Sequence, residues 1–186
     1  MNSTSLLHQS VVADTRRWLE QAVIGLNLCP FAKAVHAKDR IHYAVSMAES
    51  RDRWLAELAT ELDDLVARTS DDRDTTLLMT PLWLHDFFDF LALLRVAERS
   101  VAKRGLEGVI QLASFHPDYQ FGDAAADDIT NFSNRAPYPT LQLLREASVE
   151  RAVSAVPQAQ EIYQANMQTL CKLGHAGWMA LGVGRS

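Results

Sequence analysis

The feature of this sequence that most limits its fold is an alternation of three strand-like segments with two helix-length segments. The strand candidates are 40–47 (RIHYAVSM), 75–80 (TTLLMT) and 108–115 (GVIQLASF), and the helical segments between them are 51–68 and 82–104. Each intervening segment is long enough to cross over a sheet, so the order predicts parallel pairing with right-handed crossovers. We therefore expect an α/β fold: a small, three-stranded, mostly parallel sheet, helix-rich, with helices on both faces.

The N-terminal part of the chain is expected to be helical. Apolar residues at helical spacing predict a helix over 11–28, which Pro30 interrupts, and a second short helix through 31–35. Residues 1–10 are expected to form a loose tail of a single domain that spans 1–186.

A long loop follows the third predicted strand. Residues 116–139 lack periodicity, and loops of this length are uncommon in compact domains unless they are functional or disordered. The aromatic residues of this loop favour packing over disorder. Two more helices are expected after it, over 140–155 and 158–173.

The composition indicates a soluble globular protein. Hydrophobic residues make up 48% and charged residues 22% of 186 residues, as in ordinary single domains. The net charge of -5 provides no basic surface, so no nucleic-acid partner is expected. No long apolar run and no signal peptide are recognised, which predicts a cytoplasmic protein with no membrane span.

Cys29 stands directly before Pro30, at the junction of two predicted helices. At a helix N-terminus the dipole favours a thiolate, which would make Cys29 a nucleophile or a metal ligand. The neighbours Leu28 and Phe31 are apolar, and burial among them would instead make the thiol inert. Both interpretations stay open. The other cysteine, Cys171, occupies an apolar helical position and is expected in the core.

The carboxyl ends of the predicted strands are the expected ligand site, because loops and helix N-termini converge there in parallel sheets. His116 lies one residue beyond the third strand and is the candidate general acid or base. Arg135 offers a fixed fork of donors suited to carboxylate or phosphate. The candidate substrate-binding residues of the loop are Asp118, Tyr119, Asn134, Arg135 and Tyr138. In the structural alternative the loop is a cover, Arg135 pairs with Asp127 or Asp128, and His116 is a capping residue.

Several phrases together resemble a bacterial family of uncharacterised proteins, the domain-of-unknown-function family numbered fourteen-fifteen. They are AVIGLNLCPFAKAV, DTTLLM, LEGVIQLASFHPDYQF, DDITNFSNRAPYPTLQLLREASVERAV and LGHAGW. Cys29, His116, Asn134 and Arg135 fall within these phrases, whereas Cys171 lies between two of them. The resemblance implies no particular reaction, cofactor or partner.

Three functions remain open on the sequence. The first is an enzyme acting on a small anionic substrate, with Cys29 as nucleophile, His116 as general acid or base, and Asn134 and Arg135 holding the anion. The second is a metal- or haem-binding protein that uses Cys29 and a histidine, although no motif identifies a particular cofactor or metal. The third is a non-catalytic interaction protein, whose aromatic-rich segment 82–104 would form core or a homodimer interface.

Overall fold

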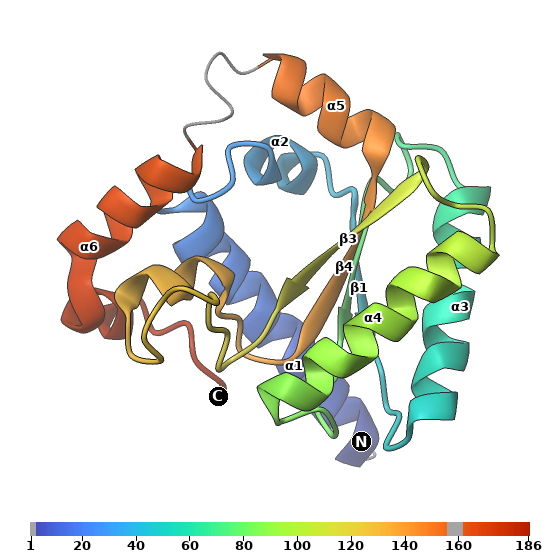
Figure 1. Ribbon diagram of the computed structural model, residues 1–186, viewed down its shortest axis with the longest axis horizontal. Coiled ribbons are helices and arrows are strands. Elements are labelled where there is room, and N and C mark those ends of the chain that lie inside the picture. The colour runs from blue at the N-terminus through green and yellow to red at the C-terminus, as the bar shows by residue number, and fades with distance from the viewer. Residues whose placement is uncertain (1–2, 156–161) are drawn as a thin grey trace.

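The centre of the fold is a four-stranded sheet with helices on both faces, seen in a computed structural model that describes residues 3–155 and 162–186 (Figure 1). The strands are β1 (Ile41–Val45), β2 (Thr75–Met79), β3 (Ile110–Phe115) and β4 (Thr140–Arg145), in the spatial order β1-β2-β4-β3. β1 and β2 are parallel, and β4 is antiparallel to both β2 and β3. The expected three-stranded, mostly parallel sheet is therefore wrong: the sheet is mixed and has a fourth strand.

The error lies at residues 140–145, which the sequence assigns to the start of a helix. Leucine, glutamine and arginine are good helix formers, and β4 runs directly into helix α5 (Glu146–Ala155) without a turn signal between them. Pairing with two neighbours overrides this propensity, since β4 bonds to β2 on one side and β3 on the other. Leu141 and Leu143, two residues apart, are buried on the same face of the sheet.

The three predicted strands are each confirmed, and all three run in one direction because β4 is antiparallel to both of its neighbours. The crossover helices between them are α3 (Arg51–Ala67) and α4 (Phe87–Lys103). The insertion of β4 separates β3 from β2, so only one pair of strands is hydrogen-bonded in parallel.

The remaining helices depart from the expected boundaries at their ends. They are α1 (Ser3–Trp18), the π-helical segment η1 (Leu19–Ile24), α2 (Ala32–Ala37), the 3₁₀ segment η2 (Ile129–Asn134) and α6 (Ile162–Ala180). The expected loose N-terminal tail is helical from Ser3 onward. The last helix, expected to end at residue 173, continues through a kink at Gly174, which has a φ of 65°. Residues 158–161 of that expected helix lie outside the described part of the chain.

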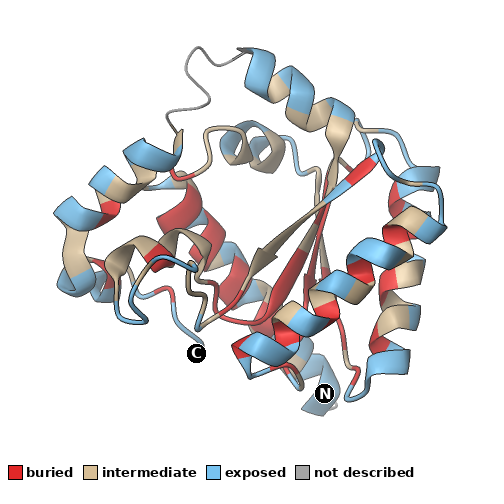
Figure 2. Ribbon diagram, viewed as in Figure 1, coloured by how far each residue is buried: buried red, intermediate tan, exposed pale blue. Residues whose placement is uncertain are grey.

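The two faces of the sheet pack against different helices. Leu78, Leu141 and Leu143 face α3 and α4, which supply Trp54, Leu58 and Phe90 to the largest core cluster. Leu77 and Met79 face α1 and contact the cluster that contains Val11. Figure 2 shows this burial along β2, β4 and the inward faces of the helices. Phe88 is 73% exposed, whereas most of the aromatic-rich face of α4 is core.

Asp14 fastens the C-terminal residues to α1. Its fully buried carboxylate accepts hydrogen bonds from the Tyr138 hydroxyl at 2.8 Å and from the Ser186 amide at 3.0 Å, and it pairs with Arg17 at 2.6 Å. Arg17 also donates to the Gly182 carbonyl at 2.9 Å. Charge-assisted bonds of this kind are stronger than neutral ones, so they fix the last residues across the N-terminal helix. In the described residues no helix is long and apolar enough to cross a membrane.

We expect Asp14→Asn to lower the free energy of unfolding by roughly 1–3 kcal/mol, because a buried charged acceptor is lost. Burial raises the pKa of Asp14, but the bonds from Ser186, Tyr138 and Arg17 outweigh it and hold the pKa below its usual 3.8. The folded state therefore binds this proton less readily, and the contribution of Asp14 is lost as the pH falls below about 3.8. Urea unfolding between pH 7 and pH 3 measures both effects. Asp123→Asn, in an exposed loop, is the control, and equal acid sensitivity of the Asp14 variant and the wild type would contradict this role.

Candidate functional site

Buried polar side chains occupy the carboxyl edge of β1, β2 and β3. Ser46, Thr80, His116 and Thr140 lie at this edge and are at most 1% exposed. The Thr80 hydroxyl accepts from the Trp54 indole at 2.9 Å, and the Thr140 hydroxyl donates to the Tyr138 carbonyl at 2.8 Å. Their hydrogen bonds are therefore made within the protein.

His116 uses both ring nitrogens within the protein. Nε2 lies 3.0 Å from the Leu84 carbonyl, and Nδ1 accepts from the Asp118 amide at 3.0 Å. A carbonyl only accepts and an amide only donates, so the ring is neutral with its proton on Nε2. Leu84 has a φ of 62°, and the bond from His116 supports this left-handed turn just before α4. Burial lowers the pKa of His116, although Asp118 and Asp86 nearby oppose the shift.

Cys29 and His116 lie on opposite sides of the sheet. Successive side chains of a strand point to opposite faces, so Phe115 points toward α1 while His116, next along the chain, points toward α4. The Phe115 ring contacts Trp18 at 5.2 Å, and the His116 ring contacts Phe90 at 5.4 Å. Cys29 packs with the Trp18 cluster. The predicted nucleophile and base are therefore separated by the sheet.

A large cavity, here called the sheet cavity, lies on the α1 side of the sheet and has a volume of about 720 Å³. Phe115, Gln142 and Leu144 form its floor, and α2, α5 and η1 contribute its walls. Its apolar lining includes Trp18, Leu19, Val23, Leu28 and Phe31. Cys29 and Asn134 both line this cavity, so these two predicted site residues are brought together.

The charged lining of the sheet cavity is predominantly cationic. Four cations, Lys38, Arg40, Arg145 and Arg151, face a single carboxylate, Asp74. Arg40 is paired with Asp71 at 2.6 Å, and Arg145 donates to the main-chain carbonyls of Leu65 and Arg73. Lys38 and Arg151 are exposed at the cavity, and Arg151 contacts the Ser148 hydroxyl at 3.0 Å. Lys38 and Arg151 are therefore the exposed cations of this lining.

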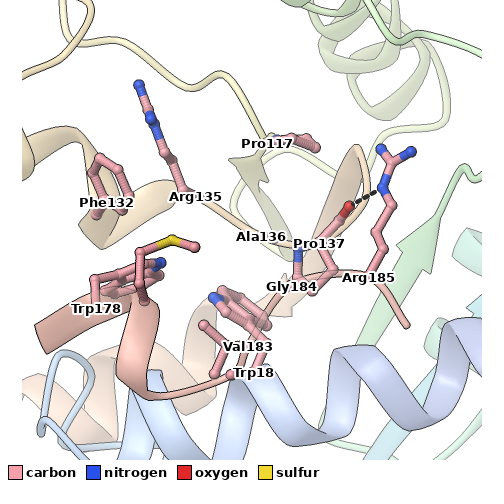
Figure 3. Close-up of a pocket in the computed structure, with 12 residues that line it drawn as sticks. Trp18, Pro117, Phe132, Arg135, Ala136, Pro137, Trp178, Val183, Gly184 and Arg185 are labelled. Carbon is pink, nitrogen blue, oxygen red and sulfur yellow. Dashed lines mark hydrogen bonds between the residues drawn. The ribbon is translucent and has the colours of Figure 1, made fainter. Parts of the chain in front are cut away.

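A second cavity, here called the tail cavity, lies between η2, the end of α6 and the C-terminal residues and has a volume of about 330 Å³ (Figure 3). Arg135 lines this cavity and not the one that holds Cys29. Its guanidinium donates to the Tyr119 and Ala126 carbonyls at 3.2 and 2.6 Å and lies over the Phe132 ring. Main-chain carbonyls thus replace the carboxylates Asp127 and Asp128 as its partners.

The other predicted loop residues support the loop itself. Tyr119 packs its ring against Phe87 at 5.1 Å, and Tyr138 is buried with its hydroxyl on Asp14. Asn134 donates to the Ser114 carbonyl at 3.3 Å while lining the sheet cavity. Asp118 is exposed, and its amide bonds His116. The sequence predicts that this loop carries site residues. It does not predict that Asn134 lines the sheet cavity while Arg135 lines a different cavity.

Several cavity residues are absent from the sequence prediction. Gln142, Arg145 and Arg151 belong to β4 and α5, which the sequence merges into one helix. The alternation of polar and apolar residues over 140–143 is the signal that could have revealed Gln142 on the floor. Cys171, expected in the core, is exposed, and both cysteines are free.

No metal centre is evident among the residues that the structure describes: no group of three or more histidine, cysteine, aspartate or glutamate side chains is close enough to hold an ion. Cys29 lies in the turn between η1 and α2, where its amide bonds the Val23 carbonyl at 3.4 Å. A metal or haem bound by Cys29 and a histidine stays a prediction of the sequence.

We expect His116→Gln to destabilise the protein by roughly 1–3 kcal/mol, since a buried donor and acceptor lose their matched partner. With its pKa lowered in the folded state, His116 stays neutral while the unfolded chain takes up a proton below the ordinary value of 6.5. Wild-type stability therefore falls as the pH drops below 6.5, and the variant loses that part of the slope. Chemical unfolding at pH 7.5 and pH 5.5 checks this, with the exposed His8→Gln as control. An unchanged slope in His116→Gln is the contrary result.

Comparison with known proteins adds a family but no activity. A search of curated proteins and a search of solved structures each find no match. The family model described as "Protein of unknown function (DUF1415)" matches residues 10–180, which takes in both cavities except for the end of the C-terminal segment. The chain therefore belongs to the DUF1415 family of proteins of unknown function.

Proposed function

We propose that this protein binds a small molecule with an apolar body and an anionic group in the sheet cavity. The observation that carries the proposal is a space of about 720 Å³ with a largely apolar lining and four cations against one carboxylate. Ligand pockets measure about 300–1,000 Å³ and combine apolar walls with a few polar groups that fix orientation. The sheet cavity fits this description.

The apolar part of the ligand is matched by the end of the cavity nearest α1. Trp18 and Leu28 are at most 6% exposed and contribute to a continuous cluster there. Burying apolar ligand surface against such walls contributes roughly 25 cal/mol per Å². This end favours a chain or a ring over a fully polar molecule.

The anionic part is matched by Lys38 and Arg151. Both are exposed cations at the cavity, and neither is paired with a carboxylate in the described residues. The Arg145 guanidinium is instead committed to the main-chain carbonyls of Leu65 and Arg73. A ligand carboxylate or phosphate at the rim would gain two charge partners.

Binding is favoured over the predicted catalysis for a geometric reason. A cysteine nucleophile needs a base within hydrogen-bond reach, and His116 is committed to Leu84 and Asp118 on the far side of the sheet. The described cavity lining includes Cys29 but no histidine. Within the proposal, the Cys29 thiol contacts the ligand and reports its presence.

The charges are tested with Lys38→Glu/Arg151→Glu, titrated with decanoate and with the neutral decanol by calorimetry at low salt. We expect the double reversal to weaken decanoate binding about tenfold or more while changing decanol binding little, because only the anion loses its partners. Arg95→Glu/Arg99→Glu, on exposed positions of α4, is the matched control for net charge. Equal loss in both double variants, or none in either, contradicts the proposal.

The location is tested through the Cys29 thiol. In Cys171→Ser, the only remaining thiol reacts with Ellman's reagent, and saturating decanoate should slow this reaction about fivefold or more by filling the cavity. Cys29→Ser leaves the exposed Cys171, whose rate should not respond to decanoate. If decanoate binds but leaves the Cys29 rate unchanged, the ligand lies elsewhere.

A further inference from the structure

The tail cavity is separate from the sheet cavity and carries a different arrangement of charge. Its described lining includes two arginines, Arg135 and Arg185, and no acidic residue. Figure 3 shows Arg135 beside Phe132 and Arg185 beside Pro137, with Pro117 and Ala136 between the two arginines. A space bordered by two cations and no carboxylate favours an anion and disfavours a cation.

The base of the tail cavity is aromatic and apolar. Trp18 and Trp178 are 2% and 7% exposed, and Val183 is 6% exposed, so these walls are fixed by packing from behind. Trp178 meets the Phe132 ring edge-on at 5.2 Å, which holds both rings in place. A flat or branched apolar group can lie against these walls without displacing them.

The two guanidinium groups are oriented while keeping donors free. Arg185 donates its Nε hydrogen to the Pro137 carbonyl at 2.6 Å and lies over the Tyr138 ring. Among the described residues, its two terminal nitrogens have no hydrogen-bond partner. Arg135 donates through Nε and one terminal nitrogen, so its other terminal nitrogen is free to donate to a ligand. Pre-oriented donors lose little side-chain entropy when a carboxylate arrives.

We propose that the tail cavity is a second binding site, which takes a small carboxylic acid with a single ring or a short branched apolar body. Its volume of about 330 Å³ is at the lower end of the range for ligand pockets, which sets the size of the ligand. The apolar body lies on Trp18 and Trp178, and the carboxylate pairs with the free terminal nitrogens of Arg185, while Arg135 adds positive charge to the lining. This site does not depend on a ligand in the sheet cavity.

The ligand chemistry is tested with phenylacetate, its neutral isostere phenylacetamide and the cation phenylethylamine, by tryptophan fluorescence and ligand-observed NMR on the full chain. We expect phenylacetate to bind, phenylacetamide to bind at least tenfold more weakly, and phenylethylamine not to bind, because only the acid carries a charge opposite to that of the lining. Equal binding of acid and amide, or no binding of the acid, overturns the proposal.

The position is tested with two variants that act differently. Arg185→Gln keeps a donor for the Pro137 carbonyl but removes the charge, and should weaken phenylacetate binding about tenfold. Gly184→Leu keeps both arginines and fills the space, since a Cβ at Gly184 meets no atom within 4 Å, and should abolish binding. Gly122→Leu, equally open and outside the cavity, is the control. Phenylacetate binding unchanged in Gly184→Leu would place the ligand elsewhere, overturning this site but not the sheet-cavity proposal.

Discussion

The pairing of β4 with strands on both of its sides is the interaction on which the rest of the structure depends. It satisfies the backbone groups of β2 and β3 that would otherwise form exposed edges. On one face β4 buries Leu141 and Leu143 against α3 and α4, each worth roughly 1.5–3 kcal/mol. On the other face it presents Gln142 and Leu144 to the sheet cavity. One strand thus completes the core and forms the floor of the candidate site.

Strand alternation then decides which side chains can act together. Phe115 and His116 are adjacent in sequence, yet the pleat sends one toward Trp18 and the other toward Phe90. Cys29 lies on the Trp18 side, so the sheet itself stands between the thiol and the imidazole. The buried His116 stabilises the turn before α4. The cations and amides that line the sheet cavity lie on the opposite face of the sheet.

Local sequence patterns predict most of the helices and strands correctly, but they do not predict the order in which the strands pair. β1, β2, β3, α3 and α4 follow from periodicity and helix stops, because each forms from residues near in sequence. β4 does not, since Leu141–Arg145 favours a helix locally and becomes a strand only through distant partners. At the carboxyl edge of the parallel strands an antiparallel strand enters the sheet, and the buried polar residues of this edge are directed into the protein, which residues near in sequence could not reveal.

Trp18 links the two candidate sites, because it lines both cavities while being only 2% exposed. Its ring is held edge-on by Phe115 at 5.2 Å, and it belongs to the cluster that contains Leu28 and Trp178. A close-packed side chain of this size cannot move without disturbing its neighbours. The indole is therefore a rigid partition, and each cavity presents cations on its own side of it. Under both proposals, an anionic group in either cavity meets the charges of that cavity alone, so ligands of different size would share only this wall.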